Sequence, residues 1–151
     1  MKPRCRKFLF LSLRVLLGAI FIAACVDKIV HPAEFAEIVQ NYQILPNNLI
    51  NIVAVTLPWL EAILGILILC GWWLPGATAL ANLLLLVFLG ALLGAVARGI
   101  DVHCGCFSTE TSGPVHTVWY VARDLLLLLL GICVMILAFG ARSEDDRRRG
   151  R

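Results

Sequence analysis

Two cysteines separated by one glycine, Cys104 and Cys106, are the residues of this chain best suited to chemistry. They lie in the stretch DVHCGCFST, where His103 directly precedes the first thiol. An extended Cys-x-Cys reaches the top of the Cα separation of about 4.4–6.8 Å that disulfides adopt. Such a bridge removes little chain entropy and is strained, and strained exposed bridges tend to be labile or catalytic. The spacing therefore favours a redox pair, with His103 stabilising a thiolate.

The same stretch supports a metal site as an alternative. His103, Cys104, Cys106 and His116 supply four soft or borderline ligands, the number that zinc or copper(I) requires. The repeated C-x2-C spacing typical of zinc sites does not occur in the sequence. A structural or inert pair is a third interpretation. The residues alone leave all three open and favour redox chemistry.

The elements that position this pair are membrane spans. The chain of 151 residues is 60% hydrophobic and 15% charged, whereas soluble domains carry about a quarter charged residues. About 20 apolar residues cross a bilayer as a helix. Segments of this kind cover residues 8–26, 49–70, 76–97 and 117–141. We predict one all-α domain over residues 1–151, an integral membrane four-helix bundle.

Basic residues at both ends predict the orientation of these spans. Lys2, Arg4, Arg6 and Lys7 precede the first span, and the arginine-rich tail 142–151 follows the last one. Positive flanks remain in the cytoplasm, so we expect a multi-pass inner-membrane protein whose Cys104/Cys106 loop faces the periplasm or exterior. Disulfides persist in that compartment. The net charge of +3 therefore reflects the orientation of the spans in the membrane, with the basic tail close to lipid headgroups. It does not indicate a nucleic-acid partner.

The first outer loop, HPAEFAEIVQNYQILPNN, contains a short helix of its own. Pro32 suits a helix start. Phe35, Ile38, Val39 and Tyr42 recur at the spacing of one helix face. We predict an amphipathic helix on the outer membrane surface, which serves as a connector or covers something beneath it.

Ionisable residues inside spans are functional candidates because they are costly there. Glu61 lies near the middle of the second span, and Arg14 lies at a similar depth in the first. One interpretation is an Arg14–Glu61 pair that holds two helices in register. The other makes Glu61 a proton-handling group or a contact for a quinone headgroup.

Arg123 and Asp124 lie in the outer half of the last span, near the expected level of the cysteines and of Lys28. Arg123 would stabilise a thiolate, or the charges would neutralise one another. Gly90 and Gly94 form a small-xxx-small pair, which predicts close helix packing.

Longer stretches carry a family resemblance. PWLEAILGILILCGWW and RGIDVHCGCFSTETSGPVHTVWYVARDLLLLLL resemble the MauE/DoxX-like family of redox-associated membrane proteins, the MauE branch in particular. The similarity covers almost the whole chain. It includes Lys28 at the end of the first span, Pro32-x-x-Phe35, Pro58-Trp59-Leu60-Glu61 and Cys104-Gly105-Cys106-Phe107.

The resemblance implies a four-helix inner-membrane protein with Cys104 and Cys106 as redox pair and Glu61 and Arg123 as supporting residues. It also implies a role in methylamine utilisation, where the family member is thought to help mature a disulfide-rich periplasmic subunit beside a thioredoxin-like partner. Three residues depart from the family pattern. Ser108 and Asp124 stand where the pattern has glycine and asparagine, and Cys25 is a cysteine late in the first span.

We therefore predict a membrane thiol–disulfide oxidoreductase. A thiolate of an extracytoplasmic thioredoxin-fold protein or disulfide-rich client attacks the Cys104–Cys106 bridge, and a quinone is the natural electron acceptor. The supporting residues are His103, Glu61, Arg123, Asp124 and Lys28. The alternatives are a metal-binding membrane protein and a non-catalytic membrane subunit.

Overall fold

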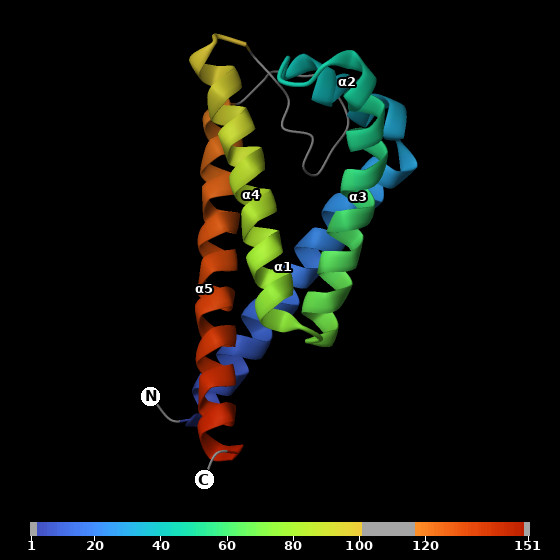
Figure 1. The fold of residues 1–151 in the computed structure, drawn as a ribbon. Helices are drawn as coiled ribbons and strands as arrows, with labels where there is room; N and C mark the ends of the chain where they lie inside the picture. Colours follow the sequence, from blue (N-terminus) through green and yellow to red (C-terminus); the bar gives the residue numbers. More distant parts are fainter. Residues whose placement is uncertain (1–2, 101–116, 150–151) are drawn as a thin grey trace.

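The computed structural model describes residues 3–100 and 117–149, and this part of the chain is helical (Figure 1). Its helices are α1 (Pro3–Val30), α2 (Pro32–Asn41), α3 (Asn47–Cys70), α4 (Leu74–Ala97) and α5 (Thr117–Arg149). The all-α prediction is confirmed.

Four of these helices contain a segment long and apolar enough to cross a membrane, with mean hydropathy between 2.3 and 2.5. At a rise of about 1.5 Å per residue, such segments exceed the roughly 30 Å of bilayer hydrocarbon. The four predicted spans are confirmed, with boundaries shifted by a few residues. The segments are Phe8–Val30, Asn47–Cys70, Leu74–Ala97 and Val118–Gly140.

Local sequence sets the helix ends. Pro32 restricts the residue before it, and His31 is non-helical at φ −120° and ψ 61°, so α1 ends at Val30 and α2 begins immediately afterwards. Gly71 ends α3 in the left-handed conformation, φ 75°, where its N–H donates to the carbonyls of Leu67 and Ile68. Both α1 and α3 are therefore joined to the next helix by very short connections.

The spans form two antiparallel pairs. α1 packs mainly on α3, and α4 mainly on α5. Both chain termini lie at one end of the bundle, and α2 lies at the other (Figure 1). We call these the termini end and the α2 end.

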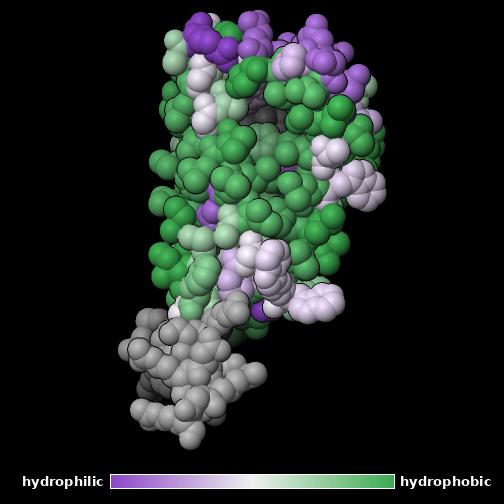
Figure 2. All heavy atoms as spheres, viewed as in Figure 1, coloured by the Kyte–Doolittle hydropathy of each residue, from purple (hydrophilic) through white to green (hydrophobic). Residues whose placement is uncertain are grey.

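The outer surface of the bundle is apolar. Hydrophobic residues cover most of the face seen in Figure 2. Large aliphatic side chains such as Leu126 (67% exposed) and Ile136 (63%) point away from the bundle. Such surfaces are stable in lipid, where they need no protein cover. The arrangement is that of a multi-pass membrane protein.

A pair of facing glycines brings α1 and α3 into close contact. A Cβ atom added to Gly18 would lie 3.1 Å from the backbone oxygen of Gly65, and one added to Gly65 would lie 3.2 Å from the oxygen of Gly18. The prediction that Gly90 and Gly94 provide close packing between spans is wrong, because an added Cβ at either position meets none of the described residues within 4 Å. Glycine spacing alone does not say which face of a helix meets a neighbour.

The predicted amphipathic helix is α2, and its predicted face packs on the bundle. Phe35, Ile38 and Tyr42 are buried. Arg98, at the end of α4, donates hydrogen bonds to the backbone oxygens of Tyr42 (2.6 Å) and Gln43 (3.3 Å). A cation beside the last carbonyls of a helix stabilises that end. Since one face is buried and one end is tied to α4, α2 covers the bundle instead of only connecting two spans.

Candidate functional site

A buried ion pair joins the first and second spans. The ammonium Nζ of Lys28 donates to both carboxylate oxygens of Glu61, each at 2.7 Å. Lys28 is 1% exposed and Glu61 5% exposed. Hydrogen bonds between two charged groups are stronger than those between neutral groups. A buried charge needs such bonds to offset the free energy lost when it leaves water. The pair is the most polar contact described in the interior of the bundle.

The predicted Arg14–Glu61 pair is wrong, because Lys28 takes the place of Arg14. The Nη2 of Arg14 donates to the backbone oxygen of Leu69 at 3.3 Å. The guanidinium also lies over Gly71, where an added Cβ would meet Nη1 at 2.5 Å. Arg14 thus turns toward the C-terminal end of α3, where the helix dipole favours a cation.

Side-chain direction explains why Lys28 and Glu61 meet. Measured from the Gly18–Gly65 contact, Lys28 lies ten residues toward the α2 end and Glu61 four residues. At about 1.5 Å per residue, their Cα atoms differ by about 9 Å along the bundle. Helical side chains lean toward the N-terminus of their own helix. In antiparallel α1 and α3 the two side chains therefore lean toward each other and close that distance.

Aromatic rings enclose the ammonium. The Nζ of Lys28 lies 5.2 Å from the ring centroids of Phe35 on α2 and Phe88 on α4. Cation–π attraction at such distances stabilises a desolvated ammonium. Helix α2 therefore covers the charged site directly, through Phe35.

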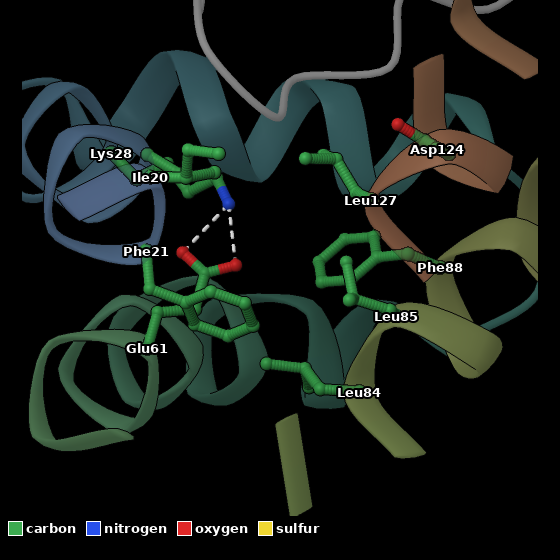
Figure 3. Close-up of a pocket in the computed structure, with 10 residues that line it drawn as sticks. Ile20, Phe21, Lys28, Glu61, Leu84, Leu85, Phe88, Asp124 and Leu127 are labelled. Atoms are coloured by element: carbon green, nitrogen blue, oxygen red, sulfur yellow. Dashed lines mark hydrogen bonds and ion pairs between the residues drawn. The ribbon is translucent and has the colours of Figure 1, made fainter. Parts of the chain in front are cut away.

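A small cavity connects the pair to the other two spans. Lys28, Glu61 and Asp124 line a space of about 30 Å³ between the two helix pairs (Figure 3). The rest of its lining consists of aliphatic side chains and the rings of Phe21 and Phe88. That volume holds a water molecule or two. Asp124 is 2% exposed, and its Oδ1 accepts from Arg123 at 3.0 Å. Lys28, Glu61, Arg123 and Asp124 thus carry two positive and two negative formal charges at one level of the bundle.

A second, larger cavity lies beside the first. It has a volume of about 190 Å³ and is bounded by apolar side chains of α2, the α2–α3 connection, α3 and α4. Phe88 and Leu84 belong to the walls of both cavities. The charged site and the apolar cavity are therefore separated by these side chains.

The predicted thiol pair lies outside the described residues. Cys104, Cys106, His103 and His116 all belong to the segment 101–116. Of the predicted supporting residues, the structure brings together Lys28, Glu61 and Asp124 around one cavity and sets Arg123 beside Asp124. Ile100 packs against the cluster that contains Ile38 and Tyr42 of α2.

Asn82 is a buried polar residue that the sequence reasoning missed. It lies on α4, where its Nδ2 donates to the oxygen of Thr78 at 2.8 Å. Its Oδ1 lies against Gly131 of α5, where an added Cβ would be 2.5 Å away. An amide inside the run ANLLLLVFLG was the available signal, since polar side chains in spans commonly mediate helix contacts.

Comparison with known proteins decides the family. The family model described as "Methylamine utilisation protein MauE" matches residues 6–139.

The chain belongs to the MauE family.

Relatives named "Methylamine utilization protein MauE" span the chain. The MauE protein of Paracoccus denitrificans is 37% identical over 125 residues, which cover 82% of this chain and 66% of that protein. That of Methylophilus methylotrophus is 33% identical over 127 residues, covering 83% and 66%. The chain thus spans just under two thirds of the length of these MauE relatives. No solved structure was found to match it.

The buried ion pair of this MauE-family chain is suited to proton transfer. A buried carboxylate and ammonium that already face each other can exchange a proton with a water molecule in the adjoining cavity. Replacing a buried ion pair by apolar residues is often neutral or stabilising. Stability is therefore a weak reason for these charges, and a functional reason is the stronger one.

Proposed function

We propose that this protein is a membrane thiol–disulfide oxidoreductase that forms disulfides in extracytoplasmic proteins through Cys104 and Cys106. The observation that carries the proposal is the enclosed Lys28–Glu61 pair with Asp124 beside it, at the α2 end of a predominantly apolar bundle. The cysteine segment starts after Ile100, which packs near α2. The charged site and the ends of the cysteine segment thus share one end of the molecule, which supports a joint role.

The exchange proceeds by two thiolate attacks. A thiolate of a thioredoxin-fold partner or client attacks one sulfur of the Cys104–Cys106 bridge, so that the bridge breaks and a mixed disulfide forms. The second thiolate of the partner then attacks that mixed disulfide. The partner leaves with a disulfide, and Cys104 and Cys106 remain as a dithiol. His103 favours the thiolate form, as an adjacent cation does in other reactive cysteines.

The charged residues support the return of the dithiol to the disulfide. Two protons leave the thiols when the bridge re-forms, and buried groups that hold charge at a fixed position stabilise such a transfer. Arg123 is one fifth exposed, next to the nearly inaccessible carboxylate of Asp124. In this proposal Arg123 stabilises a thiolate, whereas Lys28 and Glu61 hold a proton at the membrane-embedded side.

Thiol trapping in intact cells tests the proposal. A membrane-impermeant alkylating reagent is applied with and without mild reduction, and Cys104→Ser with Cys106→Ser identifies the labelled positions. We expect labelling only after reduction. The matched control is Cys70→Ser with Cys133→Ser, two exposed cysteines in spans, which should leave the pattern unchanged.

Three other outcomes would each contradict the proposal. Immediate labelling without reduction would show free thiols on the exterior. No labelling after reduction, accompanied by a stoichiometric bound metal, would favour ligation by His103, Cys104, Cys106 and His116. Full function of the double serine variant would make the protein a non-catalytic subunit.

The names of the relatives support methylamine utilisation as the setting. The basic residues that flank the first and last spans support an inner-membrane protein whose cysteine segment lies on the periplasmic side. Expression of the full chain in Paracoccus denitrificans that lacks its own MauE protein provides a test. We expect the wild type to restore growth on methylamine and the Cys104→Ser, Cys106→Ser variant to fail. Growth restored by both would show that methylamine utilisation does not require Cys104 and Cys106.

A further inference from the structure

The apolar cavity of about 190 Å³ is large enough for a ring-shaped ligand. A cavity of about 150 Å³ lined by aliphatic and aromatic groups accommodates benzene, so this one accommodates a substituted six-membered ring. Its walls include Phe35, Tyr42 and Phe88, whose rings favour stacking against another flat ring. The cavity thus suits a planar apolar molecule.

Access to this cavity leads from the lipid phase. Val87 and Ile44 belong to its walls and are 61% and 52% exposed on the apolar surface of the bundle. A ligand with a long hydrocarbon tail can therefore keep the tail in the bilayer while its ring enters between α2 and α4.

The charged site lies just beyond the wall. Phe88 lines both cavities and stands 5.2 Å from the Nζ of Lys28. A carbonyl group at the edge of a ring in the apolar cavity would be separated from the ammonium by that side chain. Turning Phe88 aside would let Lys28 donate to the carbonyl, while Glu61 remains within reach as a proton partner.

We propose that this cavity binds a prenylated quinone, which accepts the electrons of the Cys104/Cys106 dithiol. The inference rests on the proposed function, because that function requires a two-electron acceptor. When the bridge re-forms, two S–H bonds break and one S–S bond forms. The two electrons and two protons reduce the quinone to a quinol, in which two O–H bonds form.

Binding of decylubiquinone to the full-length protein in nanodiscs tests the site. The protein carries Cys104→Ser and Cys106→Ser, so that binding is measured without any redox step. We expect saturable binding. Ala91→Phe fills the cavity from α4 and should weaken binding at least tenfold, and Val53→Phe should do the same from α3. The matched control is Ala79→Phe, an exposed position on α4 outside both cavities, which should bind like the parent.

The outcomes distinguish this inference from the proposed function. Binding that does not saturate, or that Ala91→Phe and Val53→Phe leave unchanged, would overturn the quinone site and indicate that lipid acyl chains fill the cavity. If thiol trapping still showed an external reducible disulfide, the proposed function would stand with another acceptor. Saturable binding, combined with a Cys104/Cys106 pair that takes no part in disulfide exchange, would support the quinone site and contradict the proposed function.

Discussion

Neutralising one member of the Lys28–Glu61 pair should destabilise the protein strongly. Glu61→Gln keeps the shape of the side chain but leaves the ammonium of Lys28 buried at 1% exposure without its counter-ion. Breaking a buried pair in this way costs about 3–5 kcal/mol. Polar groups of a protein unfolded within the membrane also find partners, which lowers the net loss. We therefore expect a loss of about 3 kcal/mol.

Removing both charges should restore most of that stability. In Lys28→Met with Glu61→Leu, apolar side chains replace the pair, and such replacements are commonly neutral or stabilising. A double-mutant cycle built from Lys28→Met, Glu61→Leu and the double variant should give a coupling energy of at least about 3 kcal/mol, because the double variant loses far less than the two single variants together. SDS unfolding in mixed micelles, followed by tryptophan fluorescence, measures each free energy. Under the proposed function, the same double variant should re-oxidise Cys104 and Cys106 far more slowly than wild type, because it lacks the charges that hold the proton.

Two results would refute this reasoning. A loss below about 1 kcal/mol for Glu61→Gln would mean that the pair is solvated or not formed, since exposed pairs contribute only that much. Normal re-oxidation in the double variant would reduce the pair to a structural contact. Glu37→Gln, which alters an exposed carboxylate on α2, is the matched control and should change stability by less than about 0.5 kcal/mol.

Two further substitutions test the packing that holds the site. Gly18→Ala should cost about 1–3 kcal/mol, because the new methyl group overpacks the contact with α3. Gly90→Ala should be tolerated, because the new methyl group meets none of the described residues. Thermal unfolding of the two variants compares them. Arg98→Ala removes the bonds to the backbone oxygens of Tyr42 and Gln43 and should cost about 1–3 kcal/mol locally. Hydrogen exchange should then rise in α2 first, and uniform exchange throughout the bundle would contradict that role.

Sequence reasoning was reliable for the helices and less so for their contacts. The spans follow from continuous apolar runs, and α2 follows from the spacing of Phe35, Ile38 and Tyr42, because both signals depend only on local periodicity. The partner of Glu61 depends on how two helices face each other. Counting depth from the ends of the spans selected Arg14, since that count ignores the lean and length of the lysine side chain. Had side-chain direction been considered, Lys28 would have been a candidate.

Other parts of the site were beyond the reach of sequence patterns. Neither cavity can be predicted from one amino-acid sequence, because each is bounded by side chains from three or four segments that are distant in the sequence. The redox role of Cys104 and Cys106 rests on spacing and family resemblance, and it stays a prediction. The metal alternative depends on the same segment and stays a prediction as well.

The glycine contact between α1 and α3 has a bioenergetic consequence. Between the ion pair and the termini end, the contact between α1 and α3 is packed with Leu17, Leu64 and Ile68, all fully or almost fully buried, around the Gly18–Gly65 contact. In the proposed function, a proton held at Glu61 faces these closely packed aliphatic side chains of α1 and α3 on that side. In the proposed function, this packing between α1 and α3 opposes the passage of protons toward the termini end and so helps to preserve the electrochemical gradient across the membrane.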